Sequence, residues 1–418
     1  MAERRIKTVV VDDSTAVRSM VTGWVKNAPS LDLVGEAADG ESALRVCRIY
    51  NPDVVLLDVE MPGMSGLEVL KQLMKSDPTR VVIMFSALTR EGASSTIEAL
   101  ASGAADYLTK PSSMGGGRAG LDETREQLIE KATVLGERRR QTRSTPRFAA
   151  PSFLVPGASK PAPSEHPRPR LQSMGVRTPS VEASTSRPLH RPEVPKNRPA
   201  KAGRVEAVVI ASSTGGPAAL TEIVPKLSKS LPVPILLVQH MPALFTEMLA
   251  ERLNLKSEIT VKIAEDNEAV QPSTLYVAPG GIHLEVFHDS GRVLRCRLVD
   301  AAPELSCKPS ANYLFRSASR CFGSNLLGVV LTGMGQDGCA GSEELVSHGG
   351  SVIVQDEASS VVWGMPGAVT HLGIQEGVYP LTDIAEEINR RAGGASRVRR
   401  SEAARPEVGV ASLREVPR

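Results

Sequence analysis

Short apolar runs alternate with segments of helical periodicity along residues 1–136. The run at 8–13 is followed by a predicted helix, whose apolar face is formed by Val17, Met20, Val21, Trp24 and Val25. The pattern predicts strands at 8–13, 32–37, 53–58, 80–87 and 105–111, and further helices at 40–50, 66–75, 93–103 and 121–135. Because strands that alternate with helices form a parallel sheet with both faces covered, we expect a five-stranded doubly wound α/β domain.

The same alternation returns over residues 205–390. The predicted strands are 206–211, 234–239, 326–332 and 351–355, and the predicted helices are 217–227, 245–254, 310–321, 338–348 and 365–371. Residues 275–299 have the pattern of a β-hairpin placed within this order. The second predicted domain is therefore also doubly wound α/β, with a β-hairpin insertion.

The two predicted domains are separated by residues 137–204, which carry 15 basic and four acidic side chains and 12 of the 30 prolines. Prolines at that density prevent a continuous helix, and the segment has too few apolar residues for a core. We interpret it as a disordered, partly extended linker. Its basic charge could indicate a nucleic-acid or membrane contact, but a solvated, self-repelling spacer is the favoured interpretation of such a charge run. Residues 391–418 are interpreted as a polar tail.

Composition excludes several classes of protein. The chain of 418 residues has 49 basic and 47 acidic side chains and only 3% aromatic residues, which disfavours a nucleic-acid partner. No apolar run approaches the ~20 residues of a membrane span, and we expect no signal peptide. The five cysteines are odd in number and include no CxxC pair, which argues against disulfides or a zinc site and fits a cytoplasmic protein.

Acidic, hydroxyl and basic side chains lie at the ends of the predicted strands of the first domain. Asp12 and Asp13 end the first strand, Asp58 ends the third, Ser86 ends the fourth, and Lys110 follows the fifth. The carboxyl ends of parallel strands meet at one edge of the sheet, so these side chains are expected to converge. Three carboxylates repel one another, and a hard divalent cation such as Mg²⁺ relieves that repulsion.

The motifs VVVDDS, LLDVEMPGMSGLE, FSA and TKP resemble those of the response-regulator receiver domain over about residues 5–125. The resemblance implies that Asp58 accepts a phosphoryl group from a partner histidine kinase, with Mg²⁺ held by Asp12, Asp13 and Asp58. It also implies that Ser86, Tyr107 and Lys110 respond to phosphorylation. From the sequence alone, Tyr107 is equally well a half-buried strand tyrosine.

A second group of reactive residues follows strands of the second domain. The strand 206–211 runs into SSTGGP, whose glycines permit a sharp turn and whose proline suits the start of a helix. His240 follows another strand, and Asp337 lies in the glycine-rich loop LTGMGQDG. A serine, an imidazole and a carboxylate can thus converge, with Ser213 as nucleophile, His240 as base and Asp337 as the group that orients the imidazole.

Each of these residues has an ordinary alternative. The serine turn alone could bind phosphate or cap a helix, and His240 and Asp337 alone could be structural. Ser212 stands beside Ser213 as a rival hydroxyl, and His283, in the hairpin region, is a rival base.

The motifs IASSTGGP, QHMP, YVAPGGIHLE, LTGMGQDG and DEASSVVWGMPGA closely resemble the catalytic domain of the CheB family of chemotaxis protein-glutamate methylesterases. The resemblance implies that Ser213, His240 and Asp337 form the catalytic triad and that the Met334 region lies near the oxyanion site. In this chain Ala211 and Ser212 replace the Gly-Ala pair of the usual family turn.

The expected function is that of a phosphorylation-activated carboxylic ester hydrolase. It would demethylate glutamyl methyl esters, and deamidate glutamines, on methyl-accepting chemoreceptors, with no cofactor for hydrolysis itself. Three alternatives are disfavoured. A DNA-binding regulator would need a recognition helix, a nucleotide-binding module would need a Walker lysine, and a silent adaptor would not need the serine, histidine and aspartate together.

Overall fold

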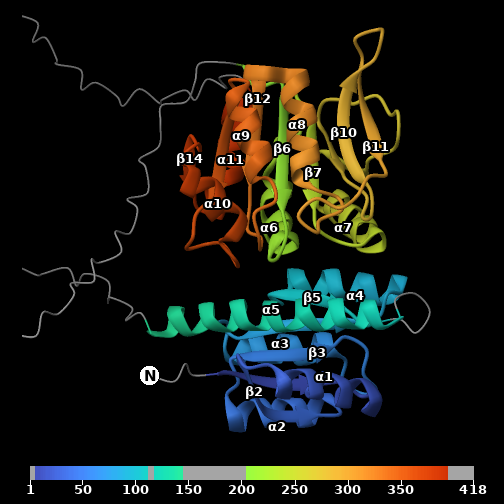
Figure 1. Cartoon of the computed structure of the whole chain (residues 1–418), viewed down its shortest axis with the longest axis vertical. Helices are drawn as coiled ribbons and strands as arrows, with labels where there is room; N and C mark the ends of the chain where they lie inside the picture. Colours follow the sequence, from blue (N-terminus) through green and yellow to red (C-terminus); the bar gives the residue numbers. More distant parts are fainter. Residues whose placement is uncertain (1–4, 112–116, 145–203, 394–418) are drawn as a thin grey trace, which may run out of the picture.

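The computed structural model describes residues 5–111, 117–144 and 204–393, which form two α/β domains in contact with each other (Figure 1). Most of the predicted linker, residues 145–203, and most of the predicted tail, residues 394–418, lie outside the described residues. The predicted tail began at residue 391, but Arg391 and Ala392 form the last residues of a helix, Leu381–Ala392. Residues 137–144 belong to α5 (Gly117–Ser144), so the last helix of the first domain runs past residue 136. No proline occurs there before Pro146, so nothing in the local sequence stops the helix.

The N-terminal domain is a five-stranded parallel sheet in the order β2-β1-β3-β4-β5, which confirms the predicted fold. The strands are β1 (Ile6–Val11), β2 (Leu31–Ala37), β3 (Val54–Asp58), β4 (Val81–Ser86) and β5 (Asp106–Thr109), and the helices before α5 are α1 (Thr15–Asn27), α2 (Gly40–Tyr50), α3 (Gly66–Ser76) and α4 (Arg90–Ala101). Side-chain caps fix where helices start: the Ser65 hydroxyl accepts from the amide of Glu68, whose carboxylate accepts from the amide of Ser65.

The C-terminal domain has a seven-stranded parallel sheet in the order β14-β13-β12-β6-β7-β9-β8. Its strands are β6 (Ala207–Ser212), β7 (Ile235–Gln239), β8 (Thr260–Ile263), β9 (Thr274–Val277), β12 (Leu326–Val330), β13 (Ser351–Gln355) and β14 (Gly377–Tyr379). Its helices are α6 (Gly216–Ile223), α7 (Ala243–Lys256), α8 (Ala311–Phe322), α9 (Cys339–Ser347), α10 (Gly364–Leu372) and α11 (Leu381–Ala392), with single 3₁₀ turns η1 (Val224–Lys226) and η2 (Gly323–Asn325).

A hairpin of β10 (His283–His288) and β11 (Leu294–Val299) stands apart from this sheet, as predicted. The predicted hairpin segment, however, began at residue 275, and Leu275 lies in β9 of the main sheet, where it pairs with Ile235 and Val261. The strands β8 and β14 and the helix α11 were not predicted. Strands of three or four residues are too short to show a clear alternation of apolar and polar side chains.

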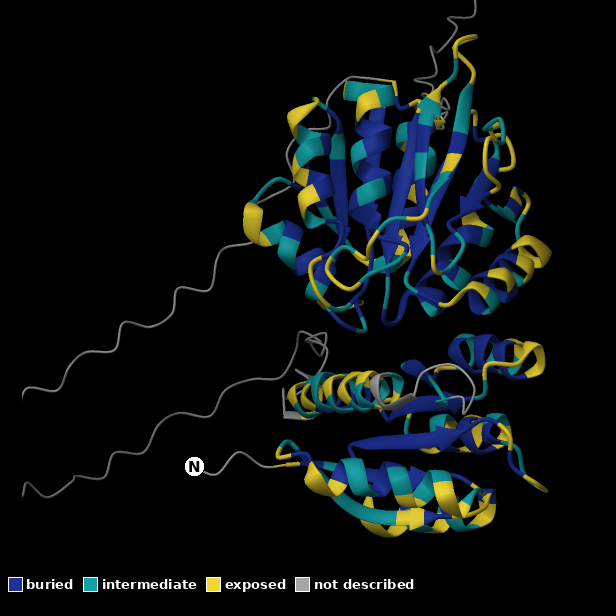
Figure 2. Cartoon of the chain, turned by 45° about the vertical axis from the view of Figure 1, so that its right-hand side comes forward, coloured by how far each residue is buried: buried dark blue, intermediate teal, exposed yellow. Residues whose placement is uncertain are grey.

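The core lies between each sheet and its covering helices, and the strands at the centre are buried along their whole length (Figure 2). Every residue of β6 and β12 is buried, as expected for parallel strands with helices on both faces. Across the described ranges, no helix has both the length and the apolar composition needed to cross a membrane.

The N-terminal domain turns α4, β5 and α5 toward α6 and α7 of the C-terminal domain (Figure 1). The Tyr107 ring stacks on the Phe245 ring with their centroids 4.6 Å apart. The Thr214 hydroxyl donates to Oδ2 of Asp106 at 2.7 Å. Because Thr214 lies just beyond the carboxyl end of β6, this contact places the N-terminal domain over that edge of the second sheet.

Candidate active site

The acidic side chains of the N-terminal domain lie together at the carboxyl ends of β1 and β3. Nζ of Lys110 is 2.9 Å from Oδ2 of Asp12 and 2.7 Å from Oδ2 of Asp58. Asp13 is exposed beside them, and one oxygen from each of the three carboxylates lies within 4.8 Å of the others. Three carboxylates around one ammonium group leave an excess of negative charge and offer only oxygen donors, so this group fits Mg²⁺.

Burial sets the charge state of Asp58. Desolvation raises the pKa of Asp58 to about 6, and repulsion from Asp12 adds to it, while the Lys110 ammonium acts in the opposite direction. Ser86 is buried at the end of β4 and donates its hydroxyl to the carbonyl of Ala87 at 3.2 Å. The ionised Asp58 is therefore costly to bury with one lysine alone, and a cation at the same edge would lower that cost.

Tyr107 lies on β5 at the contact between the domains. Its ring is buried against Phe245, and its carbonyl accepts from Nζ of Lys131 at 3.0 Å. Burial raises the pKa of the Tyr107 phenol well above its usual value, with the nearby Asp106 carboxylate adding to the effect. The side chain that sequence analysis left open as a switch or a strand tyrosine thus touches the other domain directly.

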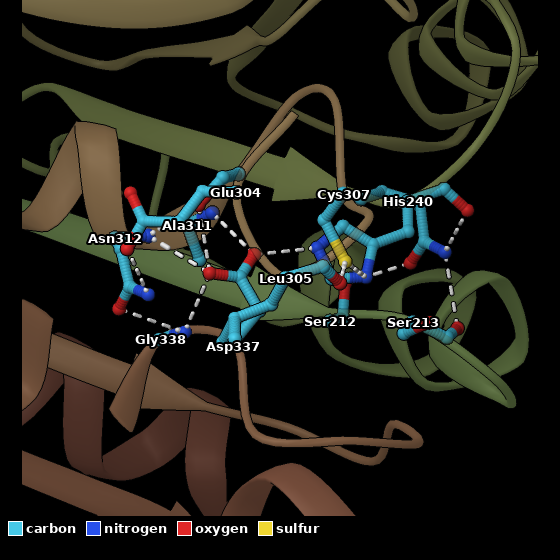
Figure 3. A network of polar contacts seen from close by, with 12 residues as sticks. Ser212, Ser213, His240, Glu304, Leu305, Cys307, Ala311, Asn312, Asp337 and Gly338 are labelled. Carbon is cyan, nitrogen blue, oxygen red and sulfur yellow. Dashed lines mark hydrogen bonds and ion pairs between the residues drawn. The ribbon is translucent and has the colours of Figure 1, made fainter. Parts of the chain in front are cut away.

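The two neighbouring serines after β6 have different surroundings. Ser212 is fully buried and donates its hydroxyl to Oε1 of Gln239 at 2.7 Å, while Nε2 of Gln239 donates to the carbonyl of Ser213 at 3.0 Å (Figure 3). Ser213 is half-buried and lines a cavity of about 840 Å³. No hydrogen bond to the Ser213 hydroxyl is found within the described residues. Ser212 therefore supports the turn, and Ser213 presents a free hydroxyl.

Two glycines allow this close arrangement. A Cβ on Gly216 would lie 2.0 Å from Oε1 of Gln239, so a side chain there would displace the amide that holds the turn. Gly333, in the loop after β12, would bring a Cβ to 3.0 Å from Cβ of Ser213 and 2.2 Å from the sulfur of Met365. Both positions need glycine because backbone and side chains approach the serine from two strands.

His240 and Asp337 form a direct pair. Nε2 of His240 is 2.8 Å from Oδ2 of Asp337, and Nδ1 on the other side of the ring is 3.7 Å from Sγ of Cys307 (Figure 3). Burial alone lowers the pKa of His240, but the contacts with Asp337 and Cys307 outweigh it and raise the pKa to about 9. These contacts therefore favour the imidazolium, which is the form that His240 would take after it accepts a proton.

Asp337 is held ionised by the start of α8. Its oxygens accept from the amide of Ala311 at 2.6 Å, the amide of Asn312 at 3.2 Å and the hydroxyl of Ser310 at 2.8 Å. Burial alone would raise the pKa of Asp337, but the hydrogen bond with His240 and these donors hold it below its usual value. Since Asp337 engages Nε2, the nitrogen left to exchange a proton with a substrate-side group is Nδ1.

His283, the rival base, lies elsewhere. It is fully buried, its Nε2 is 3.1 Å from the carbonyl of Ala302, and its Nδ1 accepts from the amide of Ser310 at 3.1 Å. Its ring stacks on Tyr313 at 3.9 Å between centroids. With both ring nitrogens occupied in the core, His283 cannot reach a substrate in this arrangement.

The cavity at Ser213 is bounded by both domains. Its walls include Ser213, His240, Cys307 and the Met334–Asp337 loop on one side, and Leu88, Tyr107 and Lys110 on the other. The N-terminal domain therefore closes part of the approach to the serine. A peptide helix is about 10–12 Å wide, so the N-terminal domain obstructs the approach of such a helix to Ser213 in this arrangement.

Sequence reasoning missed four contributors to the site, namely Gln239, Cys307, Ser310 and the Thr214–Asp106 contact. Gln239 could have been suspected, because it directly precedes His240 at the end of a buried strand. Cys307 and Ser310 lie outside the predicted strand ends, so no pattern in the chain connected them with His240 or Asp337.

The geometry can be compared with known proteins. Residues 208–388 match the family described as CheB methylesterase, and residues 8–119 match the response regulator receiver domain. A protein-glutamate methylesterase/protein-glutamine glutaminase of Maricaulis maris is 39% identical over 93% of this chain and 96% of its own. A protein of the same name from Caulobacter vibrioides, numbered 2, is 43% identical over 93% of this chain and 99% of its own.

Among solved structures, the catalytic domain of Thermotoga maritima CheB methylesterase is 40% identical, with a TM-score of 0.43, and the match covers 44% of this chain and 98% of that one.

Proposed function

The chain belongs to the CheB family of protein-glutamate methylesterases that carry a receiver domain, and from this premise we propose which of its residues perform and control the reaction. It is a phosphorylation-regulated hydrolase that removes methyl groups from glutamyl esters and deamidates glutamines. The observation that carries the assignment is the pairing of His240 with Asp337 beside the one half-buried serine of the β6 turn.

The first half of the reaction forms an acyl-enzyme. Oγ of Ser213 attacks the γ-carbonyl carbon of the methylated glutamate, and its proton passes to Nδ1 of a neutral His240. Asp337, on Nε2, holds the ring in one tautomer and stabilises the imidazolium that forms. His240 then gives the proton to the leaving methoxide, so methanol departs and the glutamyl group stays on Ser213.

The second half regenerates the enzyme. A water molecule attacks the acyl carbon while His240 takes one of its protons, and the Ser213 oxygen leaves with that proton. The product is a free glutamate side chain. The same sequence on glutamine releases ammonia instead of methanol.

The oxyanion of each tetrahedral intermediate needs hydrogen-bond donors near Ser213. Met334, Gly335 and Gln336 line the same cavity, and their loop approaches Ser213 because Gly333 has no side chain. We assign the oxyanion site to backbone N–H groups of this loop. Losing one such donor typically costs about 10²–10³ in rate.

Regulation is assigned to the acidic edge of the N-terminal domain. Asp58 would accept the phosphoryl group from a histidine kinase, with Asp12, Asp13 and Asp58 holding Mg²⁺, which neutralises charge on the transferring group. The substrate is proposed to be a methyl-accepting chemoreceptor. Phosphorylation would act through Ser86 and Tyr107 on the contact between the domains, which in this arrangement closes part of the serine cavity.

The decisive experiment is methanol release from methylated receptors by Ser213→Ala and by Ser212→Ala. Removing a nucleophile costs several orders of magnitude, so we expect Ser213→Ala to lose about 10³-fold or more. Ser212→Ala should keep more than a tenth of the rate, because its hydroxyl serves only the Gln239 hydrogen bond. If Ser212→Ala were inactive and Ser213→Ala active, the nucleophile would be Ser212 and the assignment of Ser213 would be wrong.

A further inference from the structure

Three side chains of the kind that bind metals meet beside Ser213. One ligand atom each from His240, Cys307 and Asp337 lies within 4.8 Å of the others. Sγ of Cys307 is 3.7 Å from Nδ1 of His240, and Asp337 occupies Nε2 on the opposite side of the ring (Figure 3). The hydrolytic reaction uses His240 and Asp337 but gives Cys307 no role.

Cys307 is placed at the ring by a tight turn. The amides and carbonyls of Glu304 and Cys307 bond each other at 2.8 and 3.1 Å, and the two residues between them, Leu305 and Ser306, have φ of +50° and +62°. Non-glycine residues rarely adopt this left-handed conformation, so the surroundings must hold it. The carboxylate of Glu304 accepts two hydrogen bonds from Arg316, at 2.6 and 2.7 Å, which anchor one end of the turn.

The spacing of the sulfur and the nitrogen suits a shared ion. Zinc bonds of about 2.3 Å to sulfur and about 2.0–2.1 Å to nitrogen place two tetrahedral ligands about 3.6 Å apart. The distance of 3.7 Å between Sγ of Cys307 and Nδ1 of His240 is close to this ligand-to-ligand distance. Metal-bound histidines commonly donate their other nitrogen to a carboxylate, which fixes the ring, and Asp337 already stands in that position.

We propose that a borderline-soft divalent cation, Zn²⁺ in the test below, binds between Sγ of Cys307 and Nδ1 of His240 and reversibly inhibits the hydrolase. The ion takes the lone pair that would receive the proton of Ser213, and the thiol proton of Cys307 is released to solvent. The inhibitory part rests on the proposed role of His240, whereas binding itself does not. Two protein ligands and open positions for water give a site that loads and empties reversibly.

This site and the acidic edge of the N-terminal domain differ in chemistry. The described residues contain two such clusters, and the other one, Asp12, Asp13 and Asp58, offers only oxygen. Hard Mg²⁺ prefers carboxylates, and thiolate with imidazole prefers Zn²⁺ or Co²⁺. Sequence analysis argued against zinc from the missing CxxC pair, but Cys307 and His240 are 67 positions apart, so spacing could not reveal them.

Binding is tested on the full chain with Co²⁺ as a spectroscopic substitute for Zn²⁺, in excess Mg²⁺ to saturate the acidic edge. We expect a thiolate-to-cobalt charge-transfer band in the near ultraviolet that one equivalent of Zn²⁺ removes. Cys307→Ser and Cys307→Ala should lose the band. Cys339→Ser, at a half-buried cysteine outside the cavity, is the matched control and should keep it. No band in the parent, or a band that survives both Cys307 variants, would refute the site.

Inhibition is tested on methanol release, with each variant compared with its own metal-free rate. The parent and Cys339→Ser should lose half of the rate at the Zn²⁺ concentration that displaces half of the cobalt, and a chelator should restore it. Cys307→Ser should need at least about tenfold more Zn²⁺. Full activity with zinc bound would overturn the inhibitory proposal and the role of His240 as base. Inhibition equal in all variants would place the inhibitory ion elsewhere. The metal-free rates of Ser213→Ala test the hydrolase function separately.

Discussion

Asp58 in the N-terminal domain and Asp337 in the C-terminal domain are both buried at the carboxyl edge of a parallel sheet, yet their pKa values move in opposite directions. Burial raises the pKa of Asp58 to about 6. Asp337 is equally buried, but its pKa lies below the usual value because His240 and the start of α8 donate to it. The number of fixed donors, and not the depth of burial, separates the two.

The difference matches two kinds of chemistry. Asp58 shares one lysine with Asp12, so its charge is incompletely compensated and an arriving cation or phosphoryl group finds a reactive oxygen. Asp337 has its oxygens saturated by donors in fixed positions, so it can orient His240 but cannot readily bond to anything else. A buried carboxylate with few donors thus has a raised pKa, whereas one with many donors stays ionised and fixed in orientation.

The largest effect should come from exchanging the charge of each aspartate for an amide. Asp337→Asn should lower methanol release about 10³–10⁴-fold, because an amide holds the imidazole in the wrong tautomer and cannot stabilise imidazolium. Asp58→Asn should leave the unphosphorylated rate within about twofold and abolish the response to a phosphodonor. Circular dichroism and thermal melting check that both variants fold. Equal losses in the two variants would remove the distinction between orienting and accepting carboxylates.

A smaller effect should follow from removing the N-terminal domain. A fragment from Lys201 onward lacks the domain contact that partly closes the serine cavity. Couplings of about 1–3 kcal/mol correspond to roughly 5–150-fold in rate. We expect its rate on methylated receptors to exceed that of the unphosphorylated full chain within this range. The parent treated with phosphodonor should approach the fragment. A fragment no faster than the unphosphorylated parent would show that the contact does not restrain the enzyme.

A single contact should account for part of this restraint. Thr214→Val removes the hydrogen bond to Asp106, worth about 0.5–1.5 kcal/mol, and should raise the unphosphorylated rate about two- to tenfold. The same substitution in the fragment from Lys201 is the control, because Thr214 adjoins Ser213 and could affect catalysis directly. A change of the same size in the fragment would assign the effect to the serine turn instead of the domain contact.

The last effect concerns stability and leaves the rate unchanged, because it involves a carboxylate that has many donors and no part in the reaction. Arg390, Arg391 and Tyr379 surround Glu387, and although burial opposes them, they lower the pKa of Glu387 to about 2. Because the pKa in the unfolded chain is about 4.3, its stabilising contribution is complete above that pH and is lost as pH falls toward 2. Glu387→Gln should cost about 1–3 kcal/mol of unfolding free energy at pH 7, because it leaves buried donors without their charged acceptor.

Urea unfolding of the fragment at pH 7, pH 4 and pH 3 measures this contribution. The difference between Glu387→Gln and the parent should shrink at each step, while methanol release at neutral pH stays unchanged. A difference that does not depend on pH would mean that the packing of Glu387, and not its charge, stabilises α11.

The parts of the fold and of the candidate site that depend on the ends of strands could be predicted from the sequence. Uninterrupted apolar runs such as 54–57 and 326–330 indicate a buried strand directly, and the residues that follow such strands in a parallel sheet lie at one edge of it. Asp12, Asp58 and Lys110 could therefore be grouped before their contacts were known. The short strands β8 and β14 could not be predicted, because their burial depends on neighbours far away in the chain.

The remaining part of the site comes from loops. Cys307 reaches His240 through a turn in which Leu305 and Ser306 have left-handed backbone conformations. Because neither residue is a glycine, the sequence does not indicate this turn. Ser310 reaches Asp337 because α8 points its first turn at the loop after β12. The pattern of apolar and polar residues indicates which face of a helix or strand is buried. It does not indicate which side chains a loop brings to the site.

The side on which the N-terminal domain docks has a consequence for timing. That domain meets its neighbour through α4, β5 and α5, and the cavity of about 610 Å³ beside Asp13 and Lys110 is lined by its own residues alone. If Asp58 is the phosphoryl acceptor, as proposed, a phosphodonor can approach it from this side while the two domains remain in contact. In the proposed regulation, phosphorylation therefore does not require that the domains first separate, and separation can follow it as a second step.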